Sequence, residues 1–199
     1  MNQPLKLVIL GRDGILNEYC EDHIKSPQEW TAVPGALPAV ARLNHAGWHV
    51  VVATNQSGIG RGMIDMAMVN AVHAHMMREL QAVGGRIDAV FFCPHAPAES
   101  CACRKPLPGM MLDVAHRYGV HLADVPMVAD TERDVLAAQA AGCEPHLVCT
   151  GRAAALTDAQ LDSLLAQVPT LQIHADLGAF AEHLLAREPS PGSQREALS

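Results

Sequence analysis

Short apolar runs alternate along this chain with longer segments of helical periodicity, and that alternation limits the possible folds more than any other feature. The apolar runs of strand length cover residues 7–10, 50–53, 89–92, 125–128 and 146–149. Apolar residues recur at spacings of three and four in segments 37–45, 63–83, 109–118 and 134–141, and a glycine follows each segment. Parallel strands joined by crossover helices show this pattern, because such strands are covered on both faces. The sequence therefore predicts an α/β, Rossmann-like, three-layer parallel sheet.

The length and the composition predict a single domain. With 199 residues, of which 49% are hydrophobic, the chain can bury one α/β core but is short for two. Segment 157–186 contains two amphipathic pieces around the apolar stretch 171–173, and we expect it to complete an edge of the sheet. We predict one domain over residues 1–187, without a large cap domain, and a disordered tail over residues 188–199, where apolar residues are few.

The charge balance argues against polyanionic partners. The 14 basic and 21 acidic side chains give a formal net charge of −7, so general affinity for nucleic acid or an anionic membrane is not expected. No apolar run approaches the roughly 18 residues of a membrane-spanning helix, and the N-terminus lacks a cleavable signal. These features predict a cytoplasmic protein whose partner is a small molecule, with a monomer as the default expectation.

Polar side chains follow the apolar runs at the points where the predicted strands end. The first run leads into GRDGILN (residues 11–17), the second into TNQSG (54–58), and the fourth into Asp130 and Asp134, while CRKP (103–106) follows the third. The carboxyl ends of parallel strands lie at one edge of a sheet, where such folds bind ligands. Hydroxyl, amide and ammonium groups bind phosphate oxygens, and carboxylates bind Mg²⁺. The sequence therefore indicates a phosphate and magnesium site at this edge.

These strand-end motifs resemble those of phosphatases of the haloacid dehalogenase (HAD) superfamily. The matching residues are Asp13 and Gly14 of a D-x-D-G motif, Thr54 after the second strand, Lys105 before the third helix, and Asp130 with Asp134 after the fourth strand. The stretches TNQSGIGRG, CRKPLPGM and RDGILN are also similar to the histidinol-phosphate and heptose-bisphosphate phosphatases of that superfamily. Four motifs in order, together with a metal loop, are too specific a pattern for a chance match.

The resemblance implies a stepwise, Mg²⁺-dependent removal of phosphate from a sugar phosphate. In the family, the first aspartate of D-x-D-G attacks phosphorus, and the second, here Asp13, acts as general acid and base. Thr54 and Lys105 would hold the phosphoryl group, while Asp13, through its backbone carbonyl, and Asp130 would bind Mg²⁺. Further candidates for contacts to the substrate and its phosphate are Asn55, Ser57 and Arg104.

The same resemblance implies a substrate. Within the group, the expected reaction is removal of the 7-phosphate from a D-glycero-D-manno-heptose 1,7-bisphosphate, a step in the biosynthesis of the lipopolysaccharide core. Histidinol-phosphate phosphatase is the alternative within the group. The alternative of another class is a catalytically inactive, zinc-stabilised protein that binds phosphosugars or serves as a scaffold.

Position 11 departs from the family pattern. The chain reads LGRDG where the family reads LDRDG, so Gly11 stands at the position of the nucleophilic aspartate and offers neither an attacking oxygen nor a metal ligand. Covalent catalysis loses its accelerated step without a nucleophile, so we expect impaired phosphatase activity and weaker Mg²⁺ binding. Three accounts fit the sequence: a natural loss or change of function, an introduced or erroneous substitution, and a site in which Mg²⁺ and water occupy the empty space beside Gly11 and hydrolyse the ester directly.

A second metal pattern lies after the third apolar run. Cys93-Pro94-His95 is followed after five residues by Cys101-Ala102-Cys103. Three thiolates and one imidazole are the ligands of a closed, tetrahedral zinc site, so we predict structural Zn²⁺ bound by Cys93, His95, Cys101 and Cys103. Such a site would fix the loop that leads directly into Arg104 and Lys105.

Each of these residues also has a purely structural interpretation. Asp13-Gly14 is a common turn pair, Thr54, Ser57 and Asp130 are common helix caps, and Lys105 alone would be a surface charge. Matching groups at several strand ends favour the functional interpretation. His73, His75 and most other histidines are expected at the surface or at an interface. We expect core packing for the methionines of the long second helical segment: Met63, Met66, Met68, Met76 and Met77.

Overall fold

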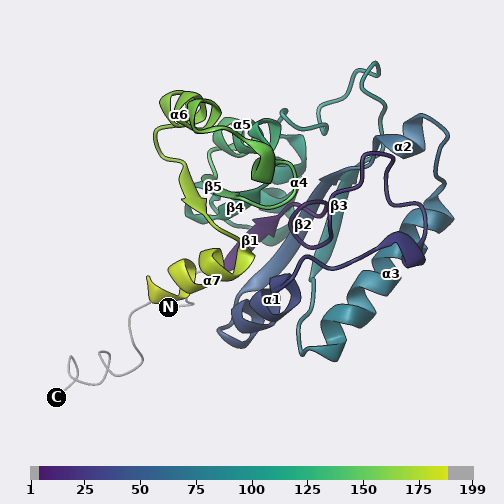
Figure 1. The fold of residues 1–199 in the computed structure, drawn as a ribbon, viewed down its shortest axis with the longest axis horizontal. Helices are drawn as coiled ribbons and strands as arrows, with labels where there is room; N and C mark the ends of the chain where they lie inside the picture. The colour runs from purple at the N-terminus through teal and green to yellow at the C-terminus, as the bar shows by residue number, and fades with distance from the viewer. Residues whose placement is uncertain (1–4, 188–199) are drawn as a thin grey trace.

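The computed structural model describes residues 5–187 and contains a parallel sheet of six strands in the order β3-β2-β1-β4-β5-β6. The strands are β1 (Leu7–Leu10), β2 (His49–Asn55), β3 (Ala89–Cys93), β4 (Pro126–Ala129), β5 (Glu144–Val148) and β6 (Gln172–His174). Helices cover both faces of the sheet (Figure 1). The predicted Rossmann-like sheet is confirmed, and the weak apolar stretch 171–173 does form its edge strand.

The helices occupy the segments between the strands. They are α1 (Ala36–His45), α2 (Ser57–Gly60), α3 (Met66–Ala82), α4 (Gly109–Tyr118), α5 (Glu132–Ala141), α6 (Asp158–Gln167) and α7 (Leu177–Ala186), with short 3₁₀ helices η1 (Pro27–Glu29), η2 (Leu122–Asp124) and η3 (Ala153–Ala155). Side chains that accept a hydrogen bond from a first-turn amide precede four of the helices: Asp65, Thr131, Thr157 and Asp176. Such caps satisfy donors that have no partner within the helix, and so they define where each helix begins.

The core explains why β1 is apolar at every position. Successive side chains of a strand point to opposite faces of the sheet. Val8 and Leu10 pack in one core cluster with residues of α1, α3 and α7, whereas Leu7 and Ile9 pack in a second cluster with residues of α4 and α5. Because helices cover both faces, the strand has no exposed side on which a polar residue would be stable.

The topology brings the predicted motifs to one place. From β1 the chain proceeds to β2 and β3 on one side, and later to β4 and β5 on the other side. The strand order therefore reverses between β1 and β4, and a crevice forms at the carboxyl ends of the strands at such a reversal. Segments 11–17 and 130–134 follow β1 and β4, and segment 54–58 begins with the last two residues of β2, so all three start at this edge.

Some expectations about side-chain burial were wrong. Met76 is fully buried, but Met63 and Met66 are each 42% exposed, because they lie before or at the first turn of α3, where the helix does not yet face the core. His146 on β5 is fully buried rather than at the surface. The predicted tail, residues 188–199, lies outside the described residues. None of the helices within residues 5–187 combines the length and the apolar character needed to cross a membrane.

Candidate active site

A cavity of about 240 Å³ lies at the carboxyl ends of the central strands. Its lining includes every side chain that the sequence had proposed for phosphate or magnesium: Asp13, Thr54, Asn55, Ser57, Arg104, Lys105, Asp130 and Asp134. These residues lie up to 121 positions apart in the sequence, from Asp13 to Asp134. The structure therefore brings the predicted groups together around one hollow, while the role of each group stays a prediction.

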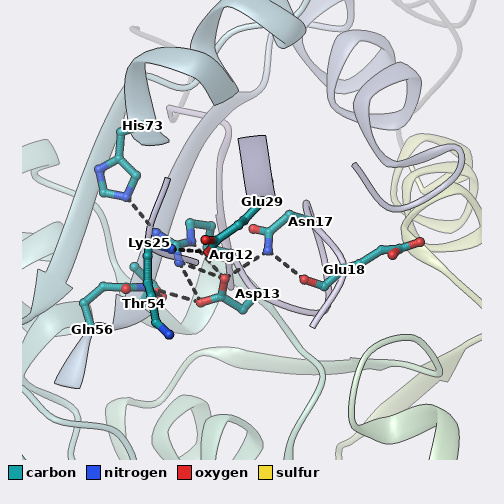
Figure 2. Close-up of polar contacts among 9 residues, drawn as sticks. All are labelled: Arg12, Asp13, Asn17, Glu18, Lys25, Glu29, Thr54, Gln56 and His73. Carbon is teal, nitrogen blue, oxygen red and sulfur yellow. Dashed lines mark hydrogen bonds and ion pairs between the residues drawn. The ribbon is translucent and has the colours of Figure 1, made fainter. Parts of the chain in front are cut away.

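The Asp13 carboxylate is held by three neighbouring side chains (Figure 2). Arg12 donates to Oδ1 over 2.8 Å and to Oδ2 over 3.0 Å, Asn17 donates to Oδ1 over 3.0 Å, and Gln56 donates to Oδ2 over 3.2 Å. Burial by itself raises the pKa of Asp13, but the Arg12 charge and these hydrogen bonds outweigh burial and leave the pKa below its ordinary value. The carboxylate is thus ionised and fixed in orientation, as a proton acceptor must be.

Arg12 and His73 form a second layer behind Asp13. Arg12 is 2% exposed, and its Nη1 lies 3.2 Å from Nε2 of His73. A guanidinium can only donate, so Nε2 of His73 must be the acceptor and carries no proton. Burial and then the Arg12 charge lower the pKa of His73 to about 4, which keeps the ring neutral. His73 was expected at the surface or at an interface; it is half-buried in the middle of α3, where it contacts Arg12 of the loop after β1.

Gln56 links Asp13 to Thr54 and was missed in the sequence. Its Nε2 donates both to Oδ2 of Asp13 and, over 3.0 Å, to Oγ1 of Thr54, and the side chain is 1% exposed. Because the Thr54 oxygen already accepts a bond, its own proton is free to be donated to an oxygen in the cavity. The position of Gln56 inside the TNQSG stretch was the available signal.

Lys105 is anchored from two sides. Its Nζ donates to the Asp134 carboxylate over 2.8 Å and to the carbonyl oxygen of Ala53 over 2.9 Å. The Asn55 amide exchanges two hydrogen bonds of 3.1 Å with the backbone of Lys105. An ammonium group has three donors, so one remains for a ligand in the cavity. Asn55 therefore serves at least to fix Lys105, and its contact to substrate stays a prediction.

Asp130 differs from Asp13 and Asp134 because no cationic side chain within residues 5–187 forms an ion pair with it. It is 3% exposed, and its Oδ2 accepts a hydrogen bond of 3.2 Å from the amide of Arg152. Burial and then the Asp134 carboxylate raise the pKa of Asp130 to about 7. A buried carboxylate that lacks a counter-charge is chemically suited to a hard cation such as Mg²⁺. The Asp13 carboxylate is held by Arg12, and the backbone carbonyl of Asp13 remains the metal ligand that the resemblance implies.

The space beside Gly11 is not empty, contrary to one of the expectations above. Its amide donates to the Val128 carbonyl over 3.0 Å, as a strand residue would. A Cβ atom placed on Gly11 would lie 2.8 Å from Cδ1 of Ile15, and the next nearest atom, the oxygen of Val128, would be 3.7 Å away. The end of the Ile15 side chain therefore packs over the glycine. A Cβ atom at position 11 would therefore require this flexible end to move.

The four residues of the predicted zinc loop form a compact cluster. Their ligand atoms all lie within 4.8 Å of one another. Tetrahedral zinc, with Zn–S of about 2.3 Å and Zn–N of about 2.1 Å, separates two sulfurs by about 3.8 Å and a sulfur from a nitrogen by about 3.6 Å. Sγ of Cys93 lies 3.8 Å from Sγ of Cys101 and 3.5 Å from Nδ1 of His95, and Sγ of Cys103 lies 3.3 Å from the same nitrogen. The cluster fits zinc and leaves no ligand position for a substrate.

Similarity to known proteins agrees with this geometry. The family described as HAD-hydrolase-like matches residues 102–178. The D-glycero-beta-D-manno-heptose-1,7-bisphosphate 7-phosphatase of Bordetella bronchiseptica is 51% identical over 184 residues, which are 91% of this chain and 98% of that protein. The protein of the same name from Pseudomonas putida is 40% identical over 181 residues, 91% of this chain and all of that protein.

This chain belongs to the HAD-like phosphatases. Solved structures of the family have the same fold: the D,D-heptose 1,7-bisphosphate phosphatase of B. bronchiseptica, complexed with magnesium and phosphate, superposes with a TM-score of 0.84 at 50% identity, covering 92% of this chain and 99% of that one. The corresponding phosphatase of Burkholderia thailandensis has a TM-score of 0.68 at 46% identity, with the same coverage. In this HAD-like phosphatase the cavity at the carboxyl ends of β1, β2 and β4 is therefore the candidate active site.

Removal of zinc is expected to loosen the loop that leads to Lys105 before it affects the sheet. Cys103 is two residues from Lys105, and Arg104 donates to the His95 carbonyl over 3.4 Å, so the metal loop and the phosphate clamp share backbone. After treatment with a chelator, hydrogen exchange in segment 94–105 should become about 10-fold faster or more, while β1 and β4 stay protected. Cys143→Ser, which removes a buried thiol outside the cluster, should leave the zinc content unchanged. Equal loss of protection in the loop and in the strands would contradict this expectation.

Proposed function

We propose that this HAD-like phosphatase binds a heptose 1,7-bisphosphate with the 7-phosphate in the cavity, and that hydrolysis is impaired because position 11 carries no carboxylate. The observation that carries the proposal is the convergence of the Thr54 hydroxyl, the Lys105 ammonium and the buried Asp130 around one cavity. A phosphate dianion accompanied by Mg²⁺ needs this combination of donors, cation and carboxylate.

The residues divide the work as follows. Thr54 and Lys105 each have one unused donor directed to a phosphate oxygen, and they would stabilise charge that develops on the transferring group. Magnesium, held by Asp130 and the backbone of Asp13, would supply further positive charge. Asp13 would take a proton from an attacking water, since Arg12, Asn17 and Gln56 keep its carboxylate ionised and in place.

The charge of the cavity supports a bisphosphate over histidinol phosphate. Arg12 pairs with Asp13, and Lys105 pairs with Asp134. The cavity is further lined by two acids, Glu21 and Asp130, and by four more arginines, namely Arg61, Arg104, Arg133 and Arg152. This excess of guanidinium groups attracts a second phosphate and repels the ammonium group of histidinol phosphate.

The comparisons support the β anomer of the sugar. The relatives that are 40% to 51% identical carry the name of the beta-heptose phosphatase, whereas proteins named for the alpha anomer, such as that of Mycobacterium bovis, are 32% identical. We propose a cytoplasmic location, where such sugar phosphates are made, and a monomer.

A binding experiment on the zinc-loaded protein tests this proposal without requiring turnover. In the presence of Mg²⁺, calorimetry should show that the β-heptose 1,7-bisphosphate binds at least about 10-fold more tightly than histidinol phosphate, a difference of about 1.4 kcal/mol. Thr54→Val, which keeps the shape and removes the hydroxyl, should weaken bisphosphate binding by about 10-fold. Equal affinity for the two esters, or no effect of Thr54→Val, would refute the proposed substrate and pocket.

A further inference from the structure

We propose that the loop of residues 150–152, directly after β5, positions the Asp130 carboxylate for a divalent cation, and that Gly151 is the residue that permits this arrangement. The inference rests on the proposed function in one respect only, namely that Asp130 binds a cation. Residues 150–152 belong to none of the motifs found in the sequence, so the loop is an additional part of the site.

Two hydrogen bonds fasten the loop to the two central motifs. Oγ1 of Thr150 donates to the carbonyl oxygen of Gly14 over 2.6 Å, and this joins the loop to the segment after β1. The amide of Arg152 donates to Oδ2 of Asp130 over 3.2 Å, and this joins the loop to the end of β4. The 150–152 loop therefore holds the first and fourth motifs at a fixed separation.

The packing around Oδ2 of Asp130 requires glycine on both sides. A Cβ atom on Gly14 would lie 2.0 Å from this oxygen, and a Cβ atom on Gly151 would lie 2.4 Å from it and 2.5 Å from Cα of Gly14. Both glycines also have positive φ, 79° and 54° respectively, which other residues rarely adopt. The oxygen is thus wedged between two residues without side chains, and Oδ1 is left to bind a ligand.

The partners that the loop supplies leave the charge of Asp130 uncompensated. A backbone amide orients a carboxylate but does not neutralise it. The loop does contain a cationic side chain, yet the Arg152 guanidinium lies over the Tyr19 ring, 4.5 Å from its centroid, and bonds the Tyr19 hydroxyl. The Arg152 guanidinium therefore binds Tyr19, although the Arg152 amide binds Asp130. This arrangement suits a carboxylate whose counter-charge is a bound cation.

A pair of glycine variants separates this role from backbone strain. Gly151→Ala introduces the clash with Asp130, whereas Gly142→Ala at the end of α5 has a similar positive φ of 79° and nothing within 4 Å of the added atom. Binding of Mn²⁺, as a probe for Mg²⁺, is measured by calorimetry on the zinc-loaded chain, both with Gly11 and with Gly11→Asp. Gly151→Ala should weaken Mn²⁺ binding by about 10-fold or more, because residues that orient a metal ligand typically contribute that much to metal affinity. Gly142→Ala should leave the Mn²⁺ affinity within about twofold of the parent.

Thr150 provides a second test that does not depend on the folding of Gly151→Ala. Thr150→Val removes the donor to Gly14 and should weaken Mn²⁺ binding by about 10-fold, whereas Thr150→Ser keeps the hydroxyl and should bind like the parent. Equal Mn²⁺ affinity for Thr150→Val and Thr150→Ser overturns the inference, and so does equal affinity for the two glycine variants.

The outcomes also distinguish this inference from the proposed function. If the parent chain binds no Mn²⁺ with either residue at position 11, the inference fails, whatever sugar phosphates the cavity binds. If Mn²⁺ binding responds as expected but the bisphosphate does not bind, the 150–152 loop positions a cation ligand and the proposed substrate is wrong.

Discussion

Gly11→Asp is expected to raise the rate of phosphate release from heptose 1,7-bisphosphate by at least about 1,000-fold, because removal of the covalent nucleophile costs on the order of 10⁶-fold even in a serine protease, which also forms a covalent intermediate. The restored carboxylate would stand at the end of β1, beside the cavity that contains Thr54, Lys105 and Asp130. It would supply both an attacking oxygen and a metal ligand. Release of inorganic phosphate, followed with and without Mg²⁺, measures the gain.

Gly11→Asn is the matched control, since asparagine has the shape of aspartate but cannot form the acyl-phosphate. It should remain as inactive as the parent. Either residue must displace Cδ1 of Ile15, so Ile15→Val is added to both variants to make room. If the asparagine variant gains as much activity as the aspartate variant, the nucleophile is not at position 11. If the parent already turns over rapidly, Gly11 does not impair the enzyme.

Lys105→Met is expected to destabilise the protein by about 3 kcal/mol, because it removes the closer cation beside the buried Asp134 carboxylate and leaves only the 3.5 Å contact to Nε of Arg133. The side chains of Lys105 and Asp134 are 3% and 6% exposed, and their charged atoms are 2.8 Å apart. Denaturation by urea gives the free energy of unfolding. The same variant should also lose bisphosphate binding, because the remaining donor of Lys105 is removed.

Two further variants show whether the loss of stability in Lys105→Met arises from the buried charge of Asp134. Adding Asp134→Asn to Lys105→Met removes the buried carboxylate and should recover more than half of the lost stability. Arg42→Met breaks the ion pair with Glu182, whose side chains are 44% and 72% exposed, and should cost less than about 1 kcal/mol. If Lys105→Met costs no more than Arg42→Met, the buried pair does not stabilise the fold.

The elements that the sequence predicted well are those with a local, periodic signal. The continuous apolar run of β1 predicted a strand buried on both faces, and α4 was expected with the bounds that it has, 109–118. The zinc cluster was also predictable, because all four ligands lie within eleven residues and their spacing is specific to metal. The bounds of β5 and α3 were predicted less well: residues 146–149 were expected where β5 spans Glu144–Val148, and 63–83 where α3 spans Met66–Ala82. Helix and strand ends depend on caps and on tertiary packing.

The hydrogen bonds that connect residues of the site left no periodic signal in the sequence. Gln56 joins Asp13 to Thr54 across 43 positions, and Thr150 bonds Gly14 across 136. A hydrogen bond between distant residues leaves no period and no spacing in the chain, so nothing marked His73 or Gly151 as part of the site, and only the TNQSG stretch pointed to Gln56. The space beside Gly11 was misjudged for another reason: its filling depends on how the side chain of Ile15, four residues on, packs against it.

The sequence by itself determined the layered α/β architecture, the family, the metal loop and the identity of the chemical groups at the strand ends, because hydrophobic periodicity and motif spacing are properties of neighbouring residues. Only the tertiary structure decided how those groups are held: which donors fix Asp13, what pairs with Lys105, and why burial and Asp134 raise the pKa of Asp130. Those outcomes follow from the reversal of strand order between β1 and β4, which places loops from distant parts of the chain in van der Waals contact.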